Sequence, residues 1–153
     1  MTYKYTLPSR AKGKLPAKKP IPVVKEGPAL SGVLKGKTAS DLEEVFGIAL
    51  DNNPRVQWWE FRKNYGAPRG QVGAIELDFL VSTGTLYLFQ IDGDWIHRTA
   101  EARAHDLVQD MRLNEMMKTK GARPVVRVQG SRLQDGLVAS QEKANRLVED
   151  LIS

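Results

Sequence analysis

Two apolar segments on either side of Gly84 carry acidic and amide side chains where β-strands are expected. Both segments are rich in Ile, Leu, Phe, Val and Tyr, which favours a β-hairpin. An odd-length turn centred on Gly84 sets Asp78 opposite Gln90. The same register sets Glu76 opposite Asp92, whereas a one-residue slip would separate these polar groups. Carboxylates on a half-buried sheet face are unfavourable without a compensating cation, so the pattern predicts a divalent metal site. The plain alternative is a solvated sheet face.

A histidine follows the second of these strands within a few residues. The segment 92–97 reads Asp-Gly-Asp-Trp-Ile-His, and His97 is one of only two histidines in the chain. A lone histidine often caps a loop or fills a polar pocket. Its position directly after the acidic strand favours a chemical site over a solvated face.

Helices and further strands must position these side chains. Ser40 and Glu43 form a capping-box pattern, which predicts a helix that begins at Thr38 or Ser40 and ends before Pro54. A second helix is expected from Thr99 to Lys118, and it carries Asp106 and Asp110 one turn apart on one face. Its expected apolar positions are Ala104, Leu107, Val108, Met111, Met116 and Met117. Strands are expected over 55–61 and 123–128, a loop over 63–70, and a closing helix over 140–152.

Composition and charge limit the class of protein. The 153 residues suit one domain, and no apolar run is long enough to cross a bilayer. The absence of cysteine excludes disulfides and thiolate metal sites and fits a cytoplasmic protein without a membrane partner. With only two histidines, a structural zinc site is not expected.

Positive charge is concentrated at the start of the chain. Residues 1–39 contain nine Lys or Arg and one acid, within a net charge of +5 for the whole protein. The segment 1–38 is also rich in Pro and Gly, which predicts an extended basic arm ahead of a domain at 39–153. Such an arm suits contact with a polyanion such as DNA. The alternative is a solubilising tail.

The order and spacing of these residues resemble the PD-(D/E)XK nuclease superfamily. Within it, the closest pattern is the branch of very-short-patch-repair mismatch endonucleases and related homing and phage endonucleases with a Glu-Asp-x-His-Asp set. The resemblance covers roughly residues 40–130. The matching positions are Glu43, Asp78-Phe79, Gln90-Ile91-Asp92-Gly93, Trp95, His97, Asp106 or Asp110, Gly121 and Arg127.

The resemblance implies an α/β, restriction-endonuclease-like fold. After the arm, the expected order is α-β-β-β-α-β-α, with a mixed sheet of about four strands flanked by helices. It also implies a Mg²⁺-dependent DNA endonuclease, in which Mn²⁺ can substitute, that acts at a mismatch, nick or branched structure. Symmetric cleavage of a junction would call for a homodimer.

The resemblance assigns roles to particular side chains. Asp78, the Gln90 amide oxygen and the Ile91 carbonyl are the expected metal ligands. His97 is expected to act as a general base or to orient water, and Asp106 or Asp110 to fix its imidazole. Glu43 is expected to orient metal-bound water. DNA contacts are expected from basic and aromatic residues: Lys12, Lys14, Lys18, Lys19, Arg62, Lys63, Arg69 and Trp95.

Two positions depart from the family pattern. Gln90 replaces a more common Glu, and Asp92 stands where many members place a lysine. The alternative function is therefore a catalytically silent DNA-binding protein with a nuclease fold.

Overall fold

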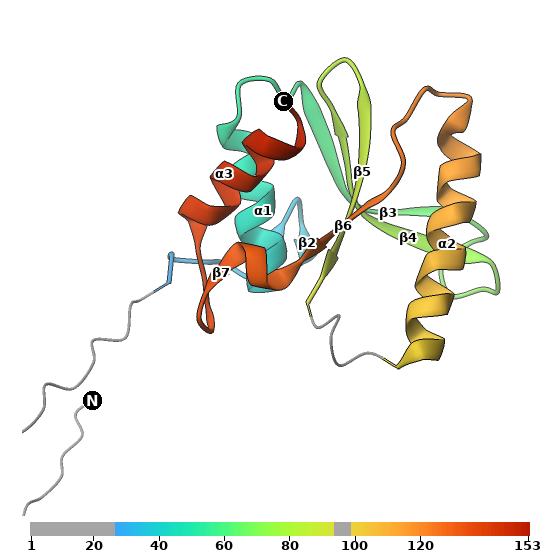
Figure 1. Cartoon of the computed structure of the whole chain (residues 1–153), viewed down its shortest axis with the longest axis horizontal. Coiled ribbons are helices and arrows are strands. Elements are labelled where there is room, and N and C mark those ends of the chain that lie inside the picture. The colour runs from blue at the N-terminus through green and yellow to red at the C-terminus, as the bar shows by residue number, and fades with distance from the viewer. Residues whose placement is uncertain (1–26, 94–98) are drawn as a thin grey trace, which may run out of the picture.

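The computed structural model describes residues 27–93 and 99–153 (Figure 1). It is a mixed α/β structure with three α-helices and one four-stranded mixed sheet. The helices are α1 (Asp41–Asn52), α2 (Ala100–Lys118) and α3 (Gln141–Leu151). The sheet strands are β3 (Trp58–Gly66), β4 (Ala74–Ser82), β5 (Leu86–Asp92) and β6 (Val126–Gln129). The prediction of a mixed sheet of about four strands flanked by helices is confirmed.

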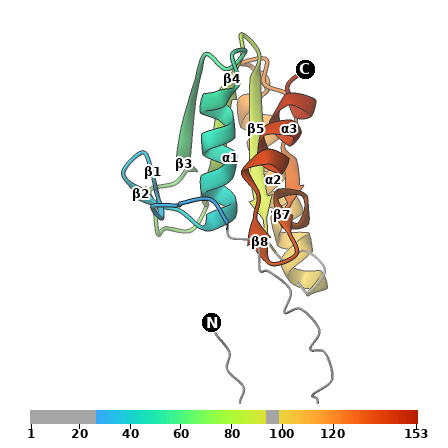
Figure 2. The ribbon, with the colours of Figure 1, turned by 90° about the vertical axis from the view of Figure 1, so that its left-hand side faces the viewer.

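The four strands lie in their order along the chain, β3-β4-β5-β6. Strands β3, β4 and β5 are antiparallel neighbours, and β6 pairs with β5 in parallel. The parallel pairing requires a crossover, which α2 provides on one face of the sheet. Helices α1 and α3 lie together on the other face (Figures 1 and 2).

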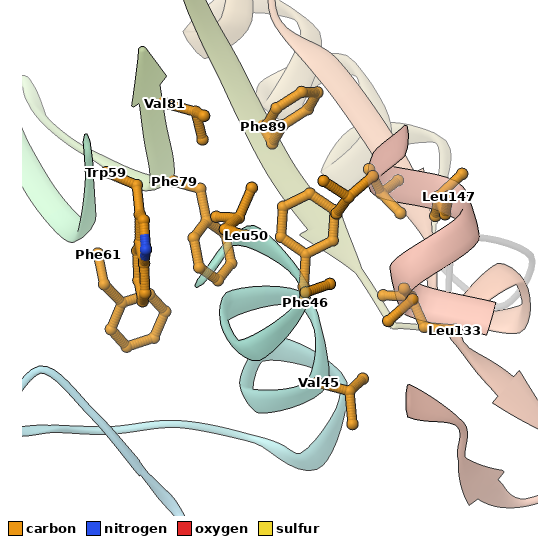
Figure 3. Close-up of a cluster of buried hydrophobic side chains, with 14 of the residues drawn as sticks. Val45, Phe46, Leu50, Trp59, Phe61, Phe79, Val81, Phe89, Leu133 and Leu147 are labelled. Carbon is orange, nitrogen blue, oxygen red and sulfur yellow. The ribbon is translucent and has the colours of Figure 1, made fainter. Parts of the chain in front are cut away.

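The larger core fills the space between the sheet and α1 with α3 (Figure 3). The Phe46 ring of α1 lies at its centre, 4.9 Å from the Phe79 ring and 5.4 Å from the Phe89 ring, measured between centroids. Trp59 is buried here while Trp58 is half exposed, as expected for neighbours on one strand.

A smaller core lies on the α2 side of the sheet. Leu80 and Leu88 of the sheet pack with Leu113 and Met117, which lie in the C-terminal half of α2. Before Leu113, the residues that α2 directs inward are Asp106 and Asp110. Of the apolar positions expected on this helix, Leu107, Val108 and Met111 therefore lie outside the core: they are 53%, 55% and 68% exposed.

Strand β3 is longer than the sequence suggested. It continues to Gly66, so residues 63–66 are paired with β4 rather than part of a loop. Arg62 has φ 54°, and the pairing of β3 with β4 skips Arg62 and resumes at Lys63 opposite Leu77. A local distortion of the β3–β4 pair therefore lies at Arg62.

A small hairpin precedes α1, within the stretch predicted to be an arm. Its strands are β1 (Val33–Leu34) and β2 (Lys37–Thr38). Leu34 is buried in the larger core, so the packed part of the chain begins before residue 39. A second small hairpin, β7 (Gln134–Asp135) and β8 (Val138–Ala139), follows the 3₁₀ helix η2 (Gly130–Leu133).

Among the described residues, none of the helices has the length and apolar character needed to cross a bilayer.

Candidate functional site

Strands β4 and β5 separate at one end, and polar side chains bridge the opening. Their paired residues run from Ser82 opposite Leu86 to Phe79 opposite Phe89, which leaves a three-residue turn around Gly84. The prediction of an odd-length turn is confirmed. If this register is continued by one more residue, Asp78 stands opposite Gln90. These two residues lie just beyond the last backbone pair, Phe79 and Phe89.

Side-chain hydrogen bonds replace the ladder beyond that point. The Asp78 N–H donates to Gln90 Oε1 at 2.8 Å, and Gln90 Nε2 donates to the Glu76 carbonyl at 3.0 Å. The Ile91 N–H donates to Asp78 Oδ2 at 2.8 Å. Because the N–H and C=O of a strand residue point to the same side, the Ile91 carbonyl faces this opening too. The three predicted metal ligands, Asp78, Gln90 and Ile91, therefore lie together.

The Asp78 carboxyl group is held in an environment that opposes its charge. Burial raises the pKa of Asp78 to about 7, although the hydrogen bond from Ile91 favours the charged form. The negative charges of Glu43 and Glu76 raise this pKa further, while Arg127 lowers it. Asp78 therefore keeps its proton to a higher pH than an exposed aspartate does.

Arg127 of β6 lies among three aspartate side chains next to this opening. Its guanidinium makes two hydrogen bonds to Asp110, Nε to Oδ2 at 2.7 Å and Nη2 to Oδ1 at 2.8 Å. Its Nη1 lies 3.6 Å from Asp92 Oδ2 and 3.7 Å from Asp106 Oδ2. Burial disfavours the charge of Arg127, but Asp110, with Asp106 and Asp92, outweighs burial and raises the pKa of the guanidinium.

Both candidate acids of α2 belong to this cluster. Asp106 and Asp110 are each 8% exposed, and Asp92 is 2% exposed. Asp106 and Asp110 are therefore buried partners of Arg127 and not solvated charges on the helix surface. Arg127 lies directly opposite Gln90 in the parallel pairing of β5 and β6, which connects this cluster to the β4–β5 opening.

Glu43 borders the site while it also caps its own helix. The Ser40 N–H donates to Glu43 Oε1 at 2.9 Å, and the Glu43 N–H donates to Ser40 Oγ at 3.2 Å. The capping box is thus confirmed. The effect of Glu43 on the pKa of Asp78 places it within electrostatic range of the opening.

Basic residues lie across β4 from the opening. Glu76 pairs with Arg62 and with Arg69, and Lys63 pairs with Glu60. These three cations, predicted for DNA contact, line one hollow together with Lys35 and Lys37. Lys35 and Lys37 fall within residues 1–38, the segment predicted to be an arm.

Several predicted site residues lie outside the described parts of the chain. They are Lys12, Lys14, Lys18, Lys19, Trp95 and His97. Within residues 27–93 and 99–153, no group of three or more His, Cys, Asp or Glu side chains is arranged to hold a metal ion.

Arg127 matches the family pattern in sequence, but no role was predicted for it. A strand Arg that pairs with aspartates of the preceding helix could have been inferred only with the parallel β5–β6 pairing in hand.

Comparison of the chain with known protein families, curated proteins and solved structures finds no match.

Proposed function

We propose that this protein is a Mg²⁺-dependent DNA endonuclease with a restriction-endonuclease-like fold of the PD-(D/E)XK type, directed at a mismatch, nick or branched structure. The observation that carries the proposal is the opening between β4 and β5. There a carboxyl group with a pKa of about 7, Asp78, lies beside further oxygen donors. Strongly perturbed acids in a polar opening are candidates for a functional site.

The residues at the opening suit a hard divalent cation. Asp78 would supply the carboxylate, the Ile91 carbonyl a main-chain oxygen, and Gln90 an amide oxygen after a side-chain rotation. Mg²⁺ is commonly held by one or two carboxylates together with substrate phosphates, so a complete protein cage is not required. When bound, Mg²⁺ would stabilise charge on the phosphate oxygens and activate water for in-line attack.

The other acids would act around this centre. Glu43 would orient attacking water, while Arg127 fixes Asp92, Asp106 and Asp110 in place. The proposed general base, His97, lies five residues after Asp92 in the sequence.

One observation favours a second candidate, a DNA-binding protein that does not cut. Both ends of the Gln90 amide are engaged with β4, its oxygen with the Asp78 N–H and its nitrogen with the Glu76 carbonyl. Asp92, at the position of the family's lysine, faces Arg127. Both positions thus serve as structural partners here, in place of a Glu ligand and a lysine.

A cleavage assay separates the two candidates. The full chain is incubated with plasmid, mismatched duplex and four-way junction in Mg²⁺ or Mn²⁺, beside the variants Asp78→Asn and Asp150→Asn. Asp150 is an exposed acid near the end of α3 and serves as the matched control. We expect the Asp78→Asn rate to fall by on the order of a hundredfold or more, as when one electrostatic stabiliser of a transition state is removed.

Binding is measured on the same DNA without metal. Asp78→Asn is expected to bind as tightly as the unaltered protein, because the substitution keeps the shape of the side chain. Binding by every variant with no cut product from any would establish the second candidate. Cutting by Asp78→Asn at the unaltered rate would contradict the role of Asp78.

A further inference from the structure

A hollow of about 360 Å³ lies between the β1–β2 hairpin and β3. Five of its lining residues are cationic and one is acidic: Lys35, Lys37, Arg62, Lys63, Arg69 and Glu60. Glu76 does not line the hollow, but it pairs with Arg62 and Arg69. When its charge is included, the cations still outnumber the carboxylates. A concave surface with this charge attracts anions.

The lysines are presented by a hairpin that is fixed to the body of the protein. Lys35 and Gly36 form its two-residue turn, with φ 49° and 79°, values typical of a tight type I′ turn. Leu34 packs closely against Gly47 of α1, where an added Cβ would lie 2.8 Å from Leu34 Cδ1. The Glu44 carboxylate accepts hydrogen bonds from the Ser31 and Gly32 N–H groups just before the hairpin.

Both ammonium groups lie along the free edge of β3. Lys35 Nζ donates to the Trp59 carbonyl at 2.7 Å, and its charge lies 4.1 Å from the centre of the Trp59 ring. Lys37 Nζ donates to the Phe61 carbonyl at 2.9 Å. A lysine ammonium has three donors, so each can still bind an anion. Because these carbonyls are already engaged, addition of another β-strand at this edge is disfavoured.

The spacing of these charges suits a chain of phosphates. Trp59 and Phe61 are two residues apart on one strand, so the carbonyls that hold the two ammonium groups are roughly 6.6 Å apart. Successive phosphates of a nucleic acid strand are separated by a similar distance. Phosphate contacts from Lys and Arg supply most of the sequence-independent affinity for DNA.

The hollow is also close to the proposed catalytic opening. Arg62 of β3 stands opposite Asp78 of β4, because its neighbours on β3 pair with Phe79 and Leu77, which flank Asp78. Adjacent strands are about 4.8 Å apart. Arg62 and Asp78 are therefore about one strand spacing apart, and β4 lies between the hollow and the opening.

We propose that the hollow between the β1–β2 hairpin and β3 binds the sugar–phosphate backbone of the DNA beside the site of cleavage. The choice of DNA as the polyanion rests on the proposed function, while the phosphate contacts rest on the charges described above. Lys35 and Lys37 are then positioning residues for the substrate.

The test is a fluorescence-anisotropy titration of a labelled DNA duplex with the full chain, repeated between about 50 and 200 mM KCl. The main variant is Lys35→Gln with Lys37→Gln, and the control is Lys118→Gln with Lys120→Gln, two exposed lysines at the end of α2 that do not line the hollow. We expect the main variant to lose on the order of tenfold in affinity, and its salt slope to fall by roughly 1 to 2, whereas the control keeps both.

A second variant covers the case in which loss of the β3 carbonyl contacts unfolds the hairpin. Lys63→Gln with Arg69→Gln alters exposed and half-exposed side chains on the other side of the hollow, and a smaller fall in the same direction is expected. Unchanged affinity and salt slope in the folded variants would overturn the inference. Equal displacement of the duplex by poly-glutamate and by unlabelled duplex of the same total charge would overturn it as well, because the hollow would then take any acidic polymer.

The variant Asp78→Asn is titrated in parallel. It removes the proposed chemistry and leaves the hollow intact, so we expect its binding to match that of the unaltered protein. Absence of cleavage by the unaltered protein would reject the catalytic proposal alone, while the lysine variants decide the binding surface separately.

Discussion

At the scale of single residues, the opening between β4 and β5 keeps a carboxyl group where burial and two nearby acids oppose its charge. A small apolar residue would pack there without this electrostatic penalty. Arg127 gathers three further carboxylates beside it, one held by two hydrogen bonds. Buried ion pairs contribute little net stabilisation. A functional role therefore explains this polar layer better than a contribution to stability does.

The raised pKa of Asp78 predicts how stability changes with pH. Between its ordinary value of 3.8 and about 7, the folded protein holds a proton that the unfolded chain has released. The free energy of unfolding should therefore fall as pH rises through this window, by at most roughly 4 kcal/mol. Urea unfolding at pH 5 and pH 8 measures the larger part of this fall, and in Asp78→Asn we expect this contribution to disappear.

Binding of Mg²⁺ at Asp78 can also be tested by thermal unfolding, without a cleavage assay. A cation bound at Asp78 favours the charged form, so Mg²⁺ should raise the midpoint of thermal unfolding at pH 8 in the unaltered protein and leave Asp78→Asn unchanged. An equal response of both proteins would contradict metal binding at this carboxyl group.

Part of the site could be predicted from the sequence because it depends on local pairing. The turn around Gly84 fixes the register of β4 and β5, which brings Asp78 level with Gln90. The position of Arg127 depends instead on a parallel pairing after a long crossover. Hydrophobic periodicity carries no information about which strand a distant strand will join.

At the scale of elements, helix α2 shows what sequence periodicity can and cannot fix. Its start and end follow from local signals, the Thr99 side chain that accepts from the Ala102 N–H and Gly121 with φ 74°. Its buried face does not follow, because the sheet opposite Asp106 and Asp110 is polar. These two acids face Arg127, and the apolar side chains of Leu107, Val108 and Met111 point outward.

Two leucines of α2 test this orientation of the helix. Leu113 is fully buried and Leu107 is 53% exposed, so the same substitution should have different effects. We expect Leu113→Ala to lower the free energy of unfolding by roughly 2–5 kcal/mol and Leu107→Ala to change it by less than about 0.5 kcal/mol. Urea unfolding followed by circular dichroism compares them. A larger loss at Leu107 would show that the apolar stripe expected from the sequence faces the core.

At the scale of the whole molecule, the chain separates apolar packing from polar chemistry across its layers. The side of the sheet that faces α1 and α3 holds the larger core, and the α2 side holds a smaller core beside the acidic cluster. Two concentrations of basic charge lie apart from this cluster: the hollow beside β3, and residues 1–26, which contain seven Lys or Arg and one acid. This separation suits a protein that holds a polyanion with one surface and presents carboxylates to it from another.

The sequence could predict the three α-helices and the central hairpin, because caps, turns and periodicity are local. It could not predict where the basic arm ends. The β1–β2 hairpin has too few residues for a strand pattern to stand out, and it is fixed by distant partners, with Leu34 against Gly47 and Ser31 against Glu44.

Two truncations test this boundary. Removal of residues 1–26 takes away a net positive charge, so affinity for a DNA duplex and its salt slope should both fall. Removal of residues 1–38 also deletes Leu34 from the core and leaves the buried Glu44 carboxylate without the Ser31 and Gly32 donors. Relative to the shorter truncation, we expect the longer one to lose roughly 3–5 kcal/mol in the free energy of unfolding. Urea unfolding and anisotropy titration of both proteins measure the two effects, and equal stability of the two truncations would show that residues 27–38 are not part of the folded body.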